Sequence, residues 1–170
     1  MASYNDGKNE IILWIAEHVP EGGTILDVGA CDGKWADMIK VICDDVIIDA
    51  VEIFAPNIVN HNLVQKYRHV YAQDVADLKY DHYDLVIFGD VLEHMTVEKA
   101  QQVLAYATDH CDDYIIGIPF MYKQPVIYGN QWERHIQDDL TPQIFEMRYP
   151  GHELLLRPRD DYAYYCKQKR

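Results

Sequence analysis

Carboxylates and glycines that could bind a cofactor gather in the stretch Ile25–Trp35, ILDVGACDGKW. An apolar strand that runs through a glycine turn into a helix is a common frame for cofactor sites. The glycines here, Gly29 and Gly33, have three residues between them, so the G-x-G-x-x-G spacing of dinucleotide-binding sites is absent. Asp32 also places a negative charge where phosphates would bind. The turn therefore disfavours NAD or FAD and suits a ligand that carries positive charge and no phosphate.

Three further carboxylates stand at or just after apolar runs that are typical of strands. Glu52 ends VIIDAVEI, and its oxygens suit the paired hydroxyls of a ribose, although a strand-end acid can also be merely solvated. Asp74 follows HVYA, where it can accept from an adenine amino group or form a local Asx turn. Asp90 follows YDLVIF. Ligands of parallel sheets bind at the carboxyl ends of the strands, so these acids are candidate cofactor contacts.

The elements that must position these residues alternate between helix and strand patterns. Helices are expected over 8–19, from Lys34, over Pro56–Gln65, after Thr96 and after Thr141. Strands are expected at 24–28, 46–53, 69–72, 83–88, 114–118, 152–156 and 161–166. A long loop separates the fifth strand from Thr141. This alternation predicts an α/β fold with a Rossmann-like, doubly wound sheet covered by helices on both faces.

Composition and charge limit the class of protein. A chain of 170 residues fits a single domain, 1–170, and its 49% hydrophobic and 25% charged residues are ordinary for a globular protein. The net charge of −13 repels phosphates, which disfavours nucleic acid as a partner. No apolar run suits a membrane span, and the N-terminus lacks a signal-peptide pattern. Because the four widely spaced cysteines also fit reduced thiols, we expect a cytoplasmic protein.

In combination, these motifs resemble those of a known family. ILDVGACDG at 25–33 is similar to motif I of the class I S-adenosylmethionine-dependent methyltransferases. VEI at 51–53, AQDVADL at 72–78 and YDLVIFGDVLEHM at 83–95 resemble the later motifs of that family, in the same order. GNQWERHIQDDLTPQIF at 129–145 is similar to a segment of small methyltransferases whose motif reads D-V-[IL]-E-H. The resemblance implies a seven-stranded sheet with an antiparallel C-terminal strand, and S-adenosylmethionine as cofactor.

The same resemblance assigns cofactor contacts to particular residues. It implies contacts with the methionine part from Asp27, Gly29, Gly33 and Asp90, with the ribose from Glu52, and with the adenine from Ile53, Asp74 and the Val75 amide. The glycines would let the backbone approach the ligand without a Cβ clash. Asp27 has a purely structural alternative, in which it caps backbone amides of the turn. One departure from the family is Cys31, where the motif often has a glycine.

Methyl transfer asks the protein mainly to align donor and acceptor, because a sulfonium already activates the methyl carbon. A hydroxyl or ammonium acceptor must also lose a proton, and the candidate bases are Glu93, His94 and His135. Each has a structural alternative. Glu93 and His94 can hold their loop, and His135 can cap its loop or pair with Asp138 or Asp139. The remaining histidines show no metal-ligand spacing, and no metal site is expected.

The sequence thus predicts methyl transfer from S-adenosylmethionine to a small or uncharged acceptor by in-line displacement. A small molecule, a sugar and a protein stay open as acceptors. The acceptor pocket is expected to come from the N-terminal helix and residues 119–140, and a homodimer is a further way to complete it. Two alternatives stay open. One is a non-catalytic cofactor-binding or scaffold protein without an open pocket beside Asp90 and His94. The other is a nucleotide-dependent oxidoreductase, which the glycine spacing disfavours.

Overall fold

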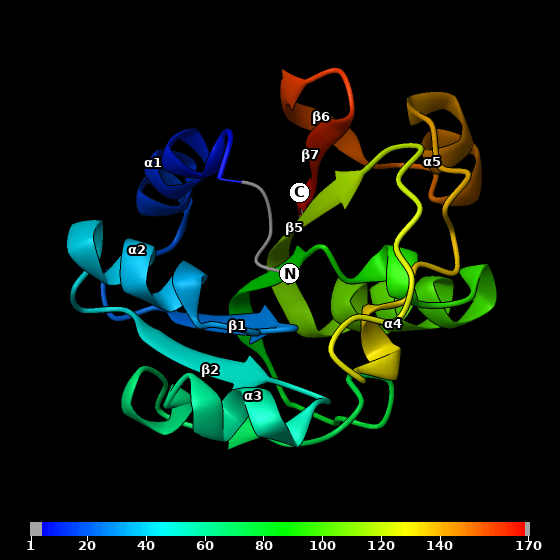
Figure 1. The fold of residues 1–170 in the computed structure, drawn as a ribbon. Coiled ribbons are helices and arrows are strands. Elements are labelled where there is room, and N and C mark those ends of the chain that lie inside the picture. The colour runs from blue at the N-terminus through cyan, green and yellow to red at the C-terminus, as the bar shows by residue number, and fades with distance from the viewer. Residues whose placement is uncertain (1–4, 169–170) are drawn as a thin grey trace.

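Seven strands form one sheet in the order β3-β2-β1-β4-β5-β7-β6 in the computed structural model, which describes residues 5–168 (Figure 1). The strands are Thr24–Val28 (β1), Ile47–Val51 (β2), Val70–Tyr71 (β3), Tyr83–Gly89 (β4), Cys111–Pro119 (β5), Glu153–Arg159 (β6) and Tyr162–Gln168 (β7). β1 to β5 are parallel, while β7 pairs antiparallel with both β5 and β6. The predicted doubly wound α/β fold with an antiparallel C-terminal strand is confirmed.

Helices cover both faces of this sheet. They are Lys8–His18 (α1), Lys34–Ile42 (α2), Ala55–Asn60 (α3), Val97–His110 (α4) and Pro142–Arg148 (α5), with short 3₁₀ turns at Leu63–Gln65 (η1), Leu92–His94 (η2) and Gln131–Glu133 (η3). α1 and α2 bury their apolar side chains with Leu85 and Ile87 of β4, whereas α4 and α5 pack with Val86 and Phe88. Because successive side chains of a strand point to opposite faces, this double burial explains why β4 is apolar throughout its middle.

Several boundaries differ from the sequence prediction, and two of these differences have a local reason that bears on the site. The helix expected over Pro56–Gln65 is two pieces, α3 and η1, because Asn62 between them adopts a left-handed backbone with φ 51°. The second strand ends at Val51 instead of Ile53, so the Glu52 side chain stands just beyond the strand. The end of the sheet, and not its interior, therefore presents this carboxylate.

The fold brings the carboxyl ends of β1, β2 and β4 together. β1 lies between β2 and β4, with Asp27 level with Ala50 on one side and Ile87 on the other. Connections leave this point toward opposite edges of the sheet, which is where ligands bind in doubly wound folds. The loop of residues 120–141, yellow-green to yellow in Figure 1, connects β5 to α5 beside these ends. Within residues 5–168, no helix is both long and apolar enough to cross a membrane.

Candidate functional site

A cavity of about 740 Å³ opens at the carboxyl ends of β1, β2 and β4. Its volume falls in the range of roughly 300–1,000 Å³ that is typical of small-molecule sites. All but two of the residues predicted for the site line it, namely Gly29, Glu52, Ile53, Asp74, Val75, Asp90, Glu93, His94 and His135. Asp27 and Gly33 are not among the lining residues. The structure thus brings the expected cofactor and catalytic residues to one place, from five separate segments of the chain.

The glycine turn after β1 contains residues with a left-handed backbone conformation and lies close to Val91. Gly29 has a φ of 73°, and a Cβ at this position would lie 2.8 Å from Cγ2 of Val91. The amides of Gly29 and Ala30 both donate to the Val51 carbonyl, at 2.8 and 3.2 Å, which fixes the turn against β2. Cys31 is also left-handed, with a φ of 50°. That conformation is one glycine adopts more readily, which accounts for the residue type common at this place in the resembling motif.

Gly33 has a different surrounding from Gly29. Its φ is 76°, and a Cβ here would lie 2.5 Å from Cδ of Lys66, outside the cavity lining. The Lys66 ammonium donates to the Asp32 carbonyl at 2.9 Å and pairs with Asp37. Gly33 therefore makes room for a lysine that pins the turn to η1, while the close approach to the cavity falls to Gly29.

Asp27 lies beneath the turn and is fully buried. Its Oδ2 accepts a hydrogen bond from the Tyr67 hydroxyl, and its Oδ1 has no hydrogen-bond partner within residues 5–168. Burial raises the pKa of Asp27 to about 7, against the opposing effect of the Tyr67 hydrogen bond. Asp27 does not cap the turn amides; in the structure, Glu52 does so.

Glu52 joins two backbone segments at the rim of β2. Oε2 accepts from the Cys31 amide at 2.8 Å and Oε1 accepts from the Phe54 amide at 2.7 Å. The residue is 4% exposed and lines the cavity. Because a carboxylate oxygen accepts two hydrogen bonds, each oxygen keeps one acceptor site for a ligand. The residue is thus oriented by the turn and available to a diol at the same time.

Asp74 is engaged locally, as the structural alternative for this residue expects. Oδ1 accepts from the Ala76 amide at 3.0 Å, which closes an Asx turn, and Oδ2 pairs with the Lys99 ammonium of α4. Lys99 also lines the cavity, beside Ile53 and Val75. Sequence reasoning missed Lys99, because its helix lies far from the Asp74 loop in the chain. The adenine end of the expected site therefore carries an ion pair instead of a free carboxylate.

A buried lysine faces Asp90 from the N-terminal helix. Lys8 is 1% exposed and its Nζ lies 4.9 Å from the centre of the Trp35 ring. Burial lowers the pKa of Lys8, and the negative charge of Asp90 opposes this. Asp90 itself has a φ of 55° and directly follows β4 at the cavity wall. The sequence did carry a signal for Lys8, since it precedes Ile11, Ile12 and Ile15 at helical spacing on the buried face of α1.

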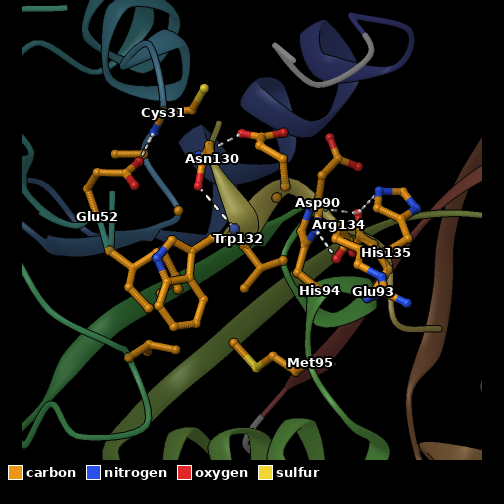
Figure 2. A pocket seen from close by; sticks show the side chains of 18 of the residues that line it. Cys31, Glu52, Asp90, Glu93, His94, Met95, Asn130, Trp132, Arg134 and His135 are labelled. Atoms are coloured by element: carbon orange, nitrogen blue, oxygen red, sulfur yellow. Dashed lines mark hydrogen bonds and ion pairs between the residues drawn. The ribbon is translucent and has the colours of Figure 1, made fainter. Parts of the chain in front are cut away.

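The three candidate bases lie near Asp90, on the side of the cavity away from Glu52, and Figure 2 shows them close together. Nε2 of His94 and Nε2 of His135 each lie 3.9 Å from Oε1 of Glu93. The two imidazole rings meet edge to face, with their centres 4.7 Å apart. Burial lowers the pKa of His94 to about 4, with His135 as the second cause, and burial also lowers the pKa of His135. Burial and then the charge of Asp90 raise the pKa of Glu93 well above its usual value.

The loop after β5 is fastened to η2, which is what places His135 there. The amides of Ile136 and Gln137 donate to the Glu93 carbonyl at 2.8 and 3.0 Å. The buried Gln137 side chain donates to the carbonyls of Leu92 and Met95 at 2.8 and 3.2 Å. Asp139 pairs with Arg148, whereas Nδ1 of His135 lies 2.7 Å from the Tyr122 carbonyl of its own loop, as its loop-capping alternative expects. Sequence reasoning missed Gln137, because glutamine in a polar loop carries no signal of burial.

Comparison with solved structures shows what this architecture is similar to. The N-terminal domain of EvdMO1, solved with SAH bound, matches with a TM-score of 0.70 and 14% identity over 99% of this chain and 83% of that one. A S-adenosylmethionine-dependent methyltransferase from Clostridium acetobutylicum matches with a TM-score of 0.70 and 12% identity, over 98% and 92%. A protein from Nostoc punctiforme assigned as an O-methyltransferase matches with a TM-score of 0.66 and 17% identity over 94% of this chain. This chain spans 56% of the Nostoc protein.

The fold is therefore that of the class I S-adenosylmethionine-dependent methyltransferases, as the sequence predicted. Neither a protein-family model nor a curated protein sequence matches this chain. At these identities the likeness extends to the fold, and the chemistry has to be argued from the cavity itself.

Proposed function

We propose that this protein is an S-adenosylmethionine-dependent methyltransferase that acts on a small or uncharged acceptor. The observation that carries the proposal is one cavity at the ends of β1, β2 and β4, which is lined on one side by Gly29 and Glu52 and on the other by Asp90, Glu93, His94 and His135. An open space beside Asp90 and His94 is what a purely structural relative of this fold would lack. SAH bound to the similar EvdMO1 domain supports the same cofactor here.

The residues fit the chemistry of this cofactor. Glu52 keeps an acceptor site on each oxygen for the ribose hydroxyls, and Gly29 leaves room for the backbone to approach the methionine part. The cavity lining has more acidic than basic side chains, which suits a ligand with a sulfonium and an ammonium. When bound, S-adenosylmethionine supplies a methyl group that its sulfonium already activates. The chain then has to hold the acceptor in line with that methyl group and exclude water.

The acceptor end is formed by the loop after β5. Val126, Trp132 and Ile136 line the cavity and are 50%, 42% and 54% exposed. Apolar side chains at a cavity mouth favour an acceptor with apolar surface over a highly charged one. Burial lowers the pKa of both His94 and His135, which favours the neutral ring of each, so with no cation bound to it either Nε2 can accept a proton from an acceptor hydroxyl or ammonium. A small molecule, a sugar or a protein side chain meets these conditions, whereas the net charge of −13 opposes nucleic acid.

Calorimetry tests the cofactor. We expect S-adenosylmethionine and S-adenosylhomocysteine to bind with 1:1 stoichiometry, and NADH to give no heat. Binding by neither sulfur compound at high micromolar concentration would contradict the proposal, and binding of NADH alone would favour the oxidoreductase alternative. Methyl transfer from a radiolabelled donor to a metabolite library then tests the activity. Cofactor binding with no methylated product from small molecules, sugars or peptides would favour a non-catalytic binding protein.

A further inference from the structure

Three side chains from two separate loops converge at the acceptor end of the cavity. Glu93 and His94 belong to η2, and His135 belongs to the loop after β5. One potential ligand atom from each of the three lies within 4.8 Å of the others. We propose that Glu93, His94 and His135 bind a divalent first-row transition-metal ion at the edge of the cavity. Figure 2 shows the three side chains gathered there, below Asp90.

The hydrogen bonds of the two histidines leave the correct ring nitrogens for a metal. Nδ1 of His94 lies 3.1 Å from the Arg134 carbonyl, and Nδ1 of His135 lies 2.7 Å from the Tyr122 carbonyl. A carbonyl only accepts, so each Nδ1 carries the proton and each Nε2 keeps its lone pair. Both Nε2 atoms are the ones near Glu93. Metal-binding histidines are held in this way, with the distal N–H donated to a carbonyl or carboxylate.

Glu93 has no other partner to justify its burial. Its side chain is 0% exposed, and neither carboxylate oxygen has a hydrogen-bond partner among the residues from 5 to 168. The 3.9 Å separations from the histidines are too long for hydrogen bonds. Two ligand atoms at about 2.1 Å from one metal ion lie roughly 3.0–3.4 Å apart. The separations here are 3.9 Å to Glu93 and at most 4.8 Å overall, so each pair of atoms would have to approach by roughly 0.5–1.8 Å to share a coordination sphere. A cation between them would offset the cost of burying the Glu93 carboxylate and would also accept the lone pair of each Nε2.

The donor set indicates the class of ion. Two imidazole nitrogens and one carboxylate oxygen suit zinc, cobalt, manganese or iron(II), whereas magnesium and calcium prefer all-oxygen sites. Three protein ligands leave coordination positions open, and all three residues line the cavity. An oxygen of the acceptor, from a hydroxyl or a carboxylate, is the ligand that fits an open position. A metal-bound hydroxyl has a lowered pKa. This last role rests on the proposed methyl transfer, but the ion site does not.

The proposal reverses the expectation from the sequence that no metal site is present. His135 comes from a different loop than Glu93 and His94, and no local spacing motif links the three. The loop is brought back by the hydrogen bonds of the Ile136 and Gln137 amides to the Glu93 carbonyl. The three potential ligands therefore come together only in the folded structure.

Cobalt(II) titration of the untagged, EDTA-treated protein tests the site. We expect visible absorption bands that saturate at one ion per chain and disappear when zinc is added. The variants Glu93→Gln and His135→Ala should each weaken cobalt binding by more than about 10-fold, because even outer partners of a metal site are worth roughly 10–100-fold in affinity. The variant that combines His61→Ala and His69→Ala removes two exposed histidines outside the cavity lining, and it should bind cobalt as the wild type does.

Several results would overturn the proposal. One is a wild-type protein that gives no cobalt spectrum and no calorimetric heat with zinc or manganese at millimolar concentration. Heat from magnesium alone would contradict the ion class. A cobalt signal that is lost in the His61 and His69 variant but kept in the Glu93 and His135 variants would assign the ion to the surface. X-ray absorption of the zinc-loaded wild type needs no variant to fold, and fewer than two imidazole ligands there would contradict the assignment.

Cofactor binding separates this test from that of the proposed function. S-adenosylhomocysteine is titrated into the EDTA-treated protein, and metal is titrated into the protein without cofactor. Cofactor binding without metal binding would overturn only the ion site. Metal binding without cofactor binding would leave the ion site standing and overturn the methyltransferase proposal. The S-adenosylhomocysteine titration also reports whether each variant is folded.

Discussion

Glu52 and Cys31 are joined by a hydrogen bond of 2.8 Å, from the Cys31 amide to Oε2 of the carboxylate. The second oxygen of Glu52 accepts from the Phe54 amide, so one side chain connects the turn after β1 to the segment after β2. These two segments form adjacent walls of the cavity. The carboxylate therefore both shapes the cavity and offers its remaining acceptor sites to a ligand.

Glu52→Gln should weaken binding of S-adenosylhomocysteine by about 5- to 150-fold, or ~1–3 kcal/mol. The NH2 group of the glutamine would face one of the two backbone N–H donors and cannot accept a hydrogen bond from it. Calorimetry of the wild type and the variant measures this loss. Glu17→Gln, on the exposed face of α1, is the matched control and should bind normally. Unchanged affinity in the Glu52 variant would mean that the ribose binds elsewhere.

The left-handed backbone at Cys31 predicts opposite effects for two substitutions. Cys31→Gly should keep the stability within about 1 kcal/mol of the wild type, since glycine adopts a φ of 50° without strain but loses more entropy on folding. Cys31→Val should cost ~1–3 kcal/mol, because a β-branched residue is disfavoured there. Urea unfolding of the three proteins compares them. Equal stability of the glycine and valine variants would show that this conformation does not limit the turn.

Alanine substitutions at two glycines with similar backbone angles distinguish the cost of backbone strain from the cost of steric crowding. Gly29 and Gly22 have φ values of 73° and 70°, but only the Gly29 position has a neighbour, Val91, that a Cβ would strike. Gly22→Ala should therefore cost only the ~1–2 kcal/mol of a left-handed alanine. Gly29→Ala should cost more, because Val91 must also move. Urea unfolding measures both, and a loss at Gly29 no larger than at Gly22 would contradict the crowding argument.

The sheet could be predicted from the sequence because its strands are apolar on both faces. The run Leu85–Phe88 is apolar at each position since helices cover both sides of β4, and the helix-start signals at Thr96 and Thr141 stand where their side chains accept from the Lys99 and Ile144 amides. The break at Asn62 was missed, because asparagine gives only a weak signal for a left-handed residue. The local sequence therefore predicts most of the strands and helix starts, whereas the end of α3 depends on the left-handed backbone of Asn62.

The sequence predicts most readily those site residues that stand directly after a strand. Glu52 and Asp90 were found because they directly follow the apolar strands β2 and β4. Lys8 and Lys99 reach the cavity from helix faces, and their positions depend on how α1 and α4 pack. The ion pair that occupies Asp74 could not be anticipated for the same reason. Contacts between distant segments are tertiary, and a single sequence carries no direct record of them.

The raised pKa of Asp27 predicts a pH dependence of stability. The folded protein holds this proton up to a pKa of about 7, whereas the unfolded chain releases it near 3.8, so between these values the folded state binds more protons. Stability from this group is therefore greatest at low pH, falls as pH rises from about 4 to about 7, and then stays level. The total is about 4 kcal/mol, at ~1.4 kcal/mol per pH unit.

Asp27→Asn should remove this contribution, because asparagine does not titrate. We expect the variant to become more stable relative to the wild type by about 3 kcal/mol as the pH rises from about 4.5 to about 8, because only the wild type loses this contribution. Urea unfolding without cofactor at several pH values measures the difference, which cancels the effect of other acids. A difference that is constant with pH would contradict a raised pKa at Asp27.

One buried glutamine fastens the cavity loop to η2. Gln137 is buried, donates to the Leu92 and Met95 carbonyls, and accepts from Arg148 and Tyr149. Gln137→Leu leaves these groups without their partner and should cost ~1–3 kcal/mol, with faster amide hydrogen exchange in residues 120–140. Gln101→Leu removes one exposed hydrogen bond to the Arg148 carbonyl and should cost less than ~1 kcal/mol. Equal losses, or unchanged exchange in the loop, would show that other contacts hold His135 against Glu93.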